Sequence, residues 1–288
     1  MGFRTVKLIT FRTPDGHESF GVLTDGGVVD AGRRLDPSAA TLRAALDAGL
    51  LEAIRALADV EPDYPLEAVQ LLAPVPEPAK LIMIGLNYRS HQEELGVPAP
   101  KHPMVIARFA NSQVGPGQPV TRPTVSEQLD YEGELAVVIG APAWRVSKQD
   151  ALAAVLGYAC YMDGSIRDFQ GHTSQVTPAK SFPGTGAFGP WIVTRDEIAD
   201  PDRLDLQTRI NGEVMQQGST SDMIWGVSDL VAYLSTCLVL QPGDVICTGT
   251  PKGVGWMRKP PRWLKPGDRV EVEIAGIGTL ANPVVAEA

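Results

Sequence analysis

Residues 130–140 read DYEGELAVVIG, and this stretch predicts a β-strand that runs into the core of the protein. Glu132 and Glu134 stand two residues apart, so on a strand both side chains leave the same face. Two carboxylates that close together repel each other unless a cation neutralises them. The pair alone also fits a solvated edge strand, but the apolar continuation LAVVIG favours a buried one. A buried pair of carboxylates needs a cation, so the stretch predicts a cation site.

A third acid fits the same site. Asp163 ends the apolar run LGYACYMD, which predicts a second strand. An aspartate at the end of a strand can also be a turn residue, and the spacing alone leaves that alternative open. Three carboxylates with no histidine or cysteine among them make a hard oxygen site, which favours Mg²⁺ or Mn²⁺ over Zn²⁺. The sequence therefore predicts one divalent ion per chain.

The composition predicts a mostly-β chain. It holds 29 glycines and 24 prolines among 288 residues without a low-complexity tract, which is typical of many short strands joined by tight turns. Asn211-Gly212, between LQTRI and EVMQQ, predicts a hairpin turn. The proline-rich stretch LLAPVPEPAK, residues 71–80, indicates a domain boundary. We therefore expect a small N-terminal domain over residues 1–73 and the main domain over residues 74–288.

Helices are expected in three places. Residues 41–58 place leucines and an isoleucine on one face, which predicts an amphipathic helix with Thr41 as its N-cap. SHQEELG, residues 90–96, predicts one or two helical turns with Ser90 as a candidate cap. VSDLVAYLSTCLVL, residues 227–240, predicts a second amphipathic helix.

Charge and hydropathy exclude several classes of function. The formal net charge is −9 and the basic residues form no stripe, so nucleic acid is not an expected partner. The chain lacks an apolar run of ~18 residues and its start lacks a signal-peptide pattern, so we expect a cytoplasmic protein with no membrane partner. Cys160, Cys237 and Cys247 stand in apolar stretches and are expected to be buried, reduced thiols.

Eight motifs, taken in order, resemble those of the fumarylacetoacetate hydrolase family over roughly residues 80–282. They are GLNYxxHxxE, DYExELAVVIG, GYxxxxDxSxRDxQ, AKSF, GPWIVT, NGEVMQQGSTSDMIW, LQPGDVICTGTPKGVG and LKPGDRVEVEIAGIGTL. One motif alone is weak, but eight in the family's order are highly specific. The resemblance implies an α+β, mostly-β fold: the family's mixed β-roll catalytic domain beside a small N-terminal β-rich domain. It also implies a homodimer.

The resemblance implies which residues bind the metal and the substrate. The metal ligands would be Glu132, Glu134 and Asp163. The substrate would be a small 2-oxo acid, whose carboxylate would contact Arg167, Gln170 and Thr250. A guanidinium suits a carboxylate because it offers a planar fork of donors.

Three further residues receive catalytic roles from the resemblance. His91 and Glu94 are three apart in a predicted helix, so the carboxylate can contact the imidazole. In the family this pair lies on a lid, where the carboxylate orients the histidine as it takes a proton from water. Lys180, within AKSF, matches the family's active-site lysine and would stabilise negative charge on an enolate.

Three positions depart from the family's pattern. Met162 stands where an asparagine is common, Pro183 where an aspartate often occurs, and Arg108 where a lysine is frequent. None of them removes a predicted metal ligand. The departures therefore bear on the substrate more than on the chemistry.

The leading functional hypothesis is a metal-dependent hydrolase that cleaves a carbon–carbon bond of a 2,4-dioxo acid, of the acylpyruvate or fumarylpyruvate type found in aromatic compound catabolism. His91, held by Glu94, would activate water, and the metal with Lys180 would stabilise the enolate. A lyase or isomerase on the same site, decarboxylating oxaloacetate or isomerising a hydroxymuconate-like diacid, is the alternative. A non-catalytic small-molecule binding protein is a third hypothesis, which the retention of all the site residues disfavours.

Overall fold

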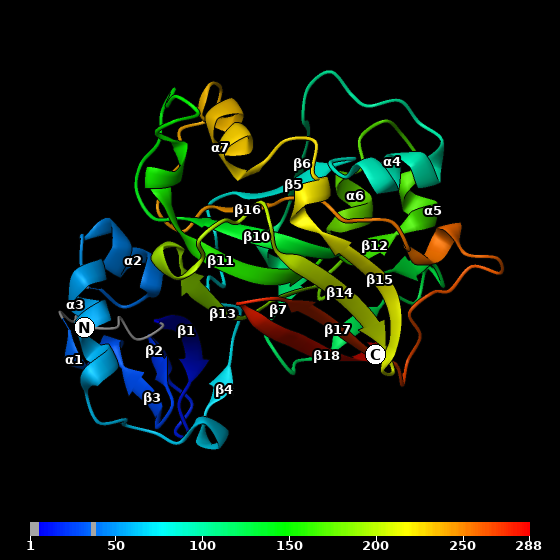
Figure 1. Cartoon of the computed structure of the whole chain (residues 1–288). Helices are drawn as coiled ribbons and strands as arrows, with labels where there is room; N and C mark the ends of the chain where they lie inside the picture. Colours follow the sequence, from blue (N-terminus) through cyan, green and yellow to red (C-terminus); the bar gives the residue numbers. More distant parts are fainter. Residues whose placement is uncertain (1–5, 36–38) are drawn as a thin grey trace.

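A large mixed sheet organises the chain (Figure 1). The computed structural model describes residues 6–35 and 39–288. Strands follow one another across this sheet in the order β3-β2-β1-β13-β11-β10-β16-β5-β6, with β4 beside β1 and β7 beside β13. Their bounds are β1 (Lys7–Arg12), β2 (Glu18–Thr24), β3 (Gly27–Asp30), β4 (Gln70–Leu71), β5 (Leu81–Gly85), β6 (Met104–Arg108), β7 (Gln113–Val114), β10 (Gly133–Ile139), β11 (Val155–Met162), β13 (Gly186–Thr194) and β16 (Val245–Cys247).

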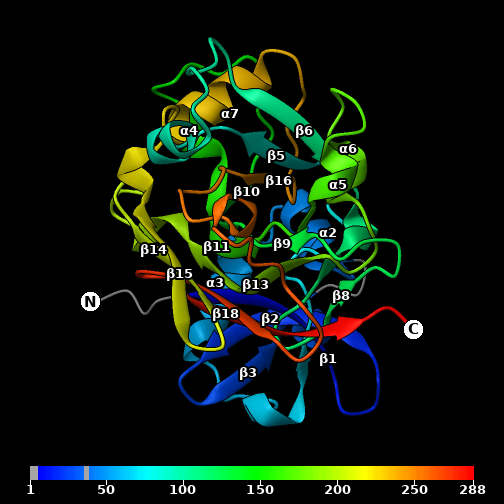
Figure 2. The same cartoon turned by 90° about the vertical axis from the view of Figure 1, so that its right-hand side faces the viewer.

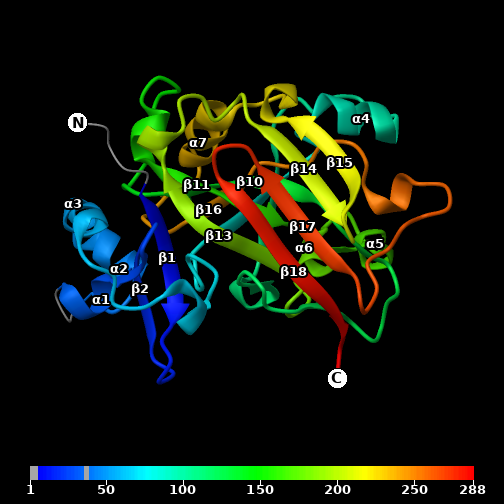
Figure 3. The ribbon, with the colours of Figure 1, turned by 60° about the horizontal axis from the view of Figure 1, so that its bottom comes forward.

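A second sheet of five strands, in the order β15-β14-β17-β18-β8, packs against the first and forms the roll (Figure 3). Its strands are β8 (Val120–Arg122), β14 (Asp205–Ile210), β15 (Glu213–Ser219), β17 (Arg269–Ile274) and β18 (Gly278–Ala286). Asn211 and Gly212 join β14 to β15 with φ angles of 53° and 83°, which confirms the predicted hairpin turn. A small two-stranded pair, β9 (Leu129–Asp130) and β12 (Ser165–Ile166), lies beside the acidic residues.

The helices are few and short, so the predicted α+β, mostly-β fold is confirmed. The α-helices are α1 (Ala31–Arg34), α2 (Leu42–Asp47), α3 (Leu51–Arg55), α4 (Arg89–Leu95), α5 (Arg167–Gln170), α6 (Thr177–Lys180) and α7 (Val227–Ser235). Single 3-10 turns are η1 (Ala56–Asp59), η2 (Leu66–Ala68), η3 (Ala110–Ser112), η4 (Ala151–Ala154), η5 (Arg195–Glu197), η6 (Thr220–Asp222) and η7 (Gly255–Met257).

The prediction of one continuous helix over residues 41–58 is wrong, because the stretch forms two short helices. Thr41 caps α2 as expected, since its hydroxyl accepts a hydrogen bond of 3.1 Å from the Ala44 backbone. Gly49 then takes a φ of 72°, which ends the helix and separates α2 from α3. The apolar periodicity survives this break because both short helices turn the same side toward the core.

The N-terminal strands extend the large sheet. β1 pairs antiparallel with β13, and α2 and α3 pack on the same apolar cluster as β10 and β11. In Figure 2 the N-terminal strands β1, β2 and β3 lie at the opposite end of the molecule from α4 and α7. The boundary between residues 73 and 74 stays a prediction.

Two further expectations concern exposure. Cys160 and Cys247 are buried, but Cys237 is exposed just past the end of α7, so its predicted burial is wrong. The helix carrying the apolar pattern ends at Ser235, which leaves Cys237 on a surface turn. Among the described residues, none of the helices has the length and apolar character needed to cross a membrane.

Candidate active site

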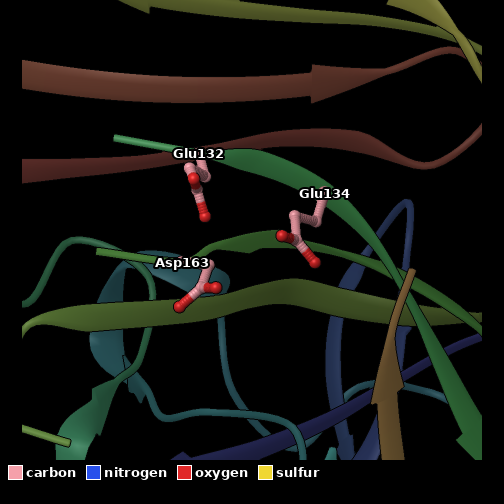
Figure 4. Close-up of side chains that lie close together, drawn as sticks. All are labelled: Glu132, Glu134 and Asp163. Carbon is pink, nitrogen blue, oxygen red and sulfur yellow. The ribbon is translucent and has the colours of Figure 1, made fainter. Parts of the chain in front are cut away.

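Three acidic side chains meet at one edge of the large sheet, where β10 begins and the neighbouring strand β11 ends (Figure 4). Glu132 and Glu134 flank the start of β10, and Asp163 follows β11 directly. The Asp163 backbone N–H donates to the Glu132 carbonyl over 2.8 Å, which fixes the two chain segments together. One carboxylate oxygen from each of the three residues lies within 4.8 Å of the others, and all three are buried. The structure therefore brings the three predicted ligands together.

The glycine between the two glutamates is required by packing. A Cβ on Gly133 would lie 2.1 Å from Thr208 Oγ1 on β14, in the second sheet. Only glycine allows β10 to approach that sheet so closely. The Glu-Gly-Glu pattern thus combines two inward carboxylates with the contact between the sheets.

The electrostatics of the cluster fit a bound cation. Burial, together with the neighbouring charges of Asp163 and Glu132, raises the pKa of Glu134 well above its ordinary value. The Glu134 carboxylate accepts a hydrogen bond of 2.9 Å from the Gly249 backbone but has no ion pair with a cationic side chain of the described chain. A buried carboxylate without its own counter-charge is costly, and a divalent ion with oxygen ligands would offset that cost. The three acids can therefore hold such an ion.

Lys180 lies directly against two of these acids. Its Nζ donates to Glu132 Oε2 over 2.5 Å, to Asp163 Oδ2 over 2.6 Å and to Ser165 Oγ over 2.7 Å. Burial lowers the pKa of Lys180, but the charges of Asp163 and Glu132 outweigh burial and raise it. The lysine is therefore a fixed, charged ammonium at the edge of the acidic cluster.

Arg167, which the resemblance assigns to the substrate carboxylate, forms hydrogen bonds with three protein side chains. Its guanidinium donates to Glu132 Oε1 over 2.6 Å, to Asp130 Oδ2 over 2.8 Å and to Gln170 Oε1 over 2.8 Å. Burial raises the pKa of Glu132, but Arg167 and Lys180 outweigh it and hold the pKa below its ordinary value. Because the Gln170 oxygen accepts from Arg167, its amide nitrogen is the group that remains to donate to a substrate. Substrate contact by Arg167 stays a prediction.

Arg108 is a site residue whose role the sequence did not reveal. The buried guanidinium donates to Asp163 Oδ1, Gly164 O, Ser112 Oγ, Ser112 O and Thr185 Oγ1. These acceptors use all five of its N–H groups. Arg108 therefore fixes the orientation of Asp163 from outside the cavity, which it does not line. The only signal in the sequence was a charged residue at the end of an apolar strand, where the family often has lysine.

His91 and Glu94 form a hydrogen-bonded pair on α4. Nδ1 of His91 lies 3.0 Å from Glu94 Oε2, and the other oxygen of Glu94 accepts from the Gly253 backbone over 2.9 Å. An ionised carboxylate only accepts hydrogen bonds, so Nδ1 of His91 carries the proton and Nε2 is the free ring nitrogen. His91 is 6% exposed and lines the cavity above the acids.

One cavity unites the predicted residues. It measures about 130 Å³, well under the roughly 300–1,000 Å³ of sites for drug-sized ligands. Its polar lining consists of His91, Glu132, Glu134, Asp163, Arg167, Gln170, Lys180 and Thr250. Glu94 stands behind His91 and is the one predicted residue outside the lining. The rest of the lining is apolar and consists of Met83, Ile84, Gly85, Leu86, Leu95, Met104, Ile106, Val176 and Trp256. The site therefore suits a small, partly charged molecule.

Thr250 is held by two neighbours. Its hydroxyl donates to Gly133 O over 3.0 Å and accepts from Gln216 Nε2 over 2.8 Å. The hydroxyl proton is therefore already used within the protein. Gln216, on β15, was not singled out in the sequence, although it links the second sheet to the site.

The β-roll and its buried acidic cluster define an enzyme class, and a family model identifies it. The model described as fumarylacetoacetate (FAA) hydrolase C-terminal matches residues 80–285. The chain therefore belongs to the fumarylacetoacetate hydrolase family, as its motifs predicted.

Relatives within the family carry different activities. A mitochondrial oxaloacetate tautomerase of Homo sapiens is 41% identical over 291 residues, which cover 98% of this chain and 92% of that protein. The oxaloacetate tautomerase YisK of Bacillus subtilis is 45% identical over 225 residues, covering 77% of this chain and 75% of that protein. The structure of a maleylpyruvate hydrolase from Sphingobium sp. SYK-6, in complex with manganese(II) ion and pyruvate, matches with a TM-score of 0.80 at 29% identity, over 98% of this chain and 100% of that chain.

Proposed function

We propose that this enzyme interconverts the enol and keto forms of oxaloacetate or a closely similar small 2-oxo diacid. The observation that carries the proposal is the similarity to oxaloacetate tautomerases, which reaches 41% identity over 98% of the chain. The cavity of about 130 Å³ suits a substrate of this size. The proposal moves the function from the hydrolase favoured by the motifs to an isomerase, but one that acts on oxaloacetate, for which the sequence analysis had expected decarboxylation.

The pair His91–Glu94 supplies the proton transfer that tautomerisation requires. In the enol-to-keto direction the enol oxygen loses one proton and the adjacent carbon gains one, so no water is consumed. Nε2 of His91 faces the cavity and can accept or donate that proton, while Glu94 holds Nδ1 and stabilises the imidazolium. A single relay of this kind is sufficient for the reaction.

The remaining charged groups bind and stabilise the substrate. The ammonium of Lys180 lies at the edge of the acidic cluster, where it can stabilise negative charge that develops on the substrate oxygen. The free amide nitrogen of Gln170 can donate to the substrate carboxylate. A divalent ion held by Glu132, Glu134 and Asp163, for which we propose Mg²⁺ or Mn²⁺, would act as a Lewis acid toward the 2-oxo group.

Carbon–carbon bond hydrolysis is the second candidate. It is supported by the match to a maleylpyruvate hydrolase that was solved with manganese(II) and pyruvate. The same His91 would then activate water in place of moving a proton on the substrate.

A product-resolved assay tests the two functions against each other. Decay of the enol absorbance of oxaloacetate is followed with Mg²⁺ or Mn²⁺ and again after EDTA, with the His91→Ala variant as the control for spontaneous tautomerisation. Metal-dependent conversion without pyruvate, at a higher kcat/KM than acylpyruvate cleavage, supports the proposal. Cleavage of an acylpyruvate or of maleylpyruvate into two acids with the higher kcat/KM would overturn it.

A further inference from the structure

The helix that carries the catalytic pair cannot fix its own position. α4 spans seven residues, and isolated helices of that length are unstable in water. Tyr88 occupies its N-cap position and makes no side-chain capping bond. Ser90, the cap predicted from the sequence, lies inside the helix, so that prediction is wrong. The placement of His91 and Glu94 therefore depends on contacts from elsewhere in the fold.

The N-terminal end of α4 is held by a carboxylate far away in the sequence. Oδ2 of Asp222, at the end of η6, accepts a hydrogen bond of 3.0 Å from the Ser90 backbone N–H. The two residues are 132 positions apart. A carboxylate at this position satisfies a free N–H of the first turn and interacts favourably with the helix dipole. Asp222 thus takes the role that a local N-cap residue would have.

Hydrogen bonds to the start of α4 and to Asn87 just ahead of it hold the segment around Asp222. Arg89 Nη1 donates to the carbonyl oxygens of Asp222 and Met223 over 3.2 and 2.7 Å. The Ile224 N–H donates to the Asn87 carbonyl over 2.7 Å. The segment that presents the carboxylate is therefore bound to the chain on both sides of the start of α4.

The other end of the catalytic pair is held by a glycine turn. Glu94 Oε1 accepts from the Gly253 N–H over 2.9 Å, and Gly253 has a φ of 104°. A Cβ at Gly253 would lie 2.4 Å from Met215 O, so no other residue fits there without displacing the backbone. The same turn binds Glu134 through the Gly249 N–H. α4 is thus tied to the metal-ligand cluster at one end and to Asp222 at the other.

We propose that Asp222 is a positioning residue, which caps α4 from outside and holds the His91–Glu94 pair over the cavity. The inference rests on the proposed function, because it takes His91 to be the group that transfers the proton. Asp222 does not line the cavity, so it acts through α4 and not on the substrate. Its loss is expected to lower kcat more than it raises KM, because the substrate-binding groups lie on other elements.

The test compares three variants of the whole chain. Asp222→Ala removes the acceptor, whereas Asp222→Asn keeps an oxygen that can accept from Ser90. Asp202→Ala is the matched control, since Asp202 accepts from the Val227 N–H at the start of α7, a helix that carries no site residue. The measurements are kcat and KM for the enol, and amide hydrogen exchange across residues 89–95.

Asp222→Ala is expected to lower kcat about 10-fold, the effect of losing one capping interaction, and to speed exchange in α4. Asp222→Asn should recover most of both properties, and Asp202→Ala should leave kcat and exchange in α4 unchanged. The inference would be overturned if the amides of α4 exchanged at the wild-type rate in Asp222→Ala. It would also be overturned if Asp202→Ala lost as much kcat as Asp222→Ala. If the wild-type enzyme showed no tautomerase activity, the proposed function would be overturned. Amide exchange in α4 needs no substrate, so it would still decide whether Asp222 positions the helix.

Discussion

Asp163 Oδ2 accepts a hydrogen bond of 2.6 Å from Lys180 Nζ, and its other oxygen accepts from the guanidinium of Arg108. The carboxylate is thus held between two buried cations that come from different elements, α6 and β6. Removing either cation would leave one buried oxygen of this carboxylate without its charged hydrogen-bond partner.

Arg108→Lys is expected to weaken binding of Mn²⁺ by about 10- to 100-fold, the usual effect of losing a group that orients a metal ligand. Lysine keeps the positive charge but has three donors in place of a planar fork of five. Calorimetric titration of the EDTA-treated variant with Mn²⁺ measures the effect. Arg203→Lys, at a residue whose side chain is 80% exposed, is the control. Unchanged Mn²⁺ affinity in Arg108→Lys would show that charge alone is sufficient.

Glu134→Gln is expected to abolish metal-dependent turnover and to reduce Mn²⁺ affinity by more than about 100-fold, since a direct ligand outweighs an outer partner. The variant should at the same time be no less stable than the wild type without metal, because it removes a buried carboxylate that lacks an ion pair. Turnover after EDTA and thermal unfolding with and without Mn²⁺ check both parts. Glu127→Gln, at an exposed residue of the preceding segment, is the control. Full Mn²⁺ binding by Glu134→Gln would remove Glu134 from the ligand set.

His91→Ala is expected to lower kcat by about 100- to 10,000-fold, the range for loss of a general acid–base group. Binding of Mn²⁺ should persist, because His91 belongs to α4 and not to the acidic cluster. Steady-state kinetics and Mn²⁺ titration separate the two effects. His102→Ala, at an exposed histidine stacked on Tyr233, should leave kcat unchanged. A variant at His91 that retained wild-type kcat would exclude it as the proton-transfer group.

Asp63→Asn is expected to reduce stability at neutral pH only. Burial raises the pKa of Asp63, but hydrogen bonds from Arg34 and the Asp30 N–H outweigh it and hold the pKa below its ordinary value of 3.8. A pKa lowered by folding means that the ionised carboxylate stabilises the fold at neutral pH, and this contribution is lost as the pH falls through the lowered pKa.

The free energy of unfolding of Asp63→Asn should therefore lie about 1 kcal/mol below that of the wild type at pH 7, and the difference should shrink toward pH ~3. Urea denaturation at several pH values measures it. Asp47→Asn is the control, since Asp47 is half exposed and its nearest Arg43 nitrogen is 3.9 Å away. A difference that grew as the pH fell would contradict the prediction.

Much of the fold could be predicted from local patterns, whereas most of the site followed from the family resemblance, since the residues alone indicated only Glu132, Glu134 and Asp163. The alternation and apolar runs predicted the strands around the site, and Asn211-Gly212 predicted the hairpin, because backbone preferences act over a few residues. Eight of the nine predicted site residues line one cavity, and the ninth supports His91. The residues do not distinguish hydrolysis from tautomerisation, since the same side chains serve proton transfer in both reactions.

The sequence by itself determined the family, the mostly-β fold and the Glu132–Glu134 pair, because each depends on residue types at fixed spacings along the chain. Only the tertiary structure decided how those residues are held. Arg108 reaches Asp163 across 55 positions, and Asp222 reaches Ser90 across 132. The break at Gly49 and the exposure of Cys237 also depend on how neighbouring segments pack. Contacts between distant segments form only when the sheets assemble, so no local pattern encodes them.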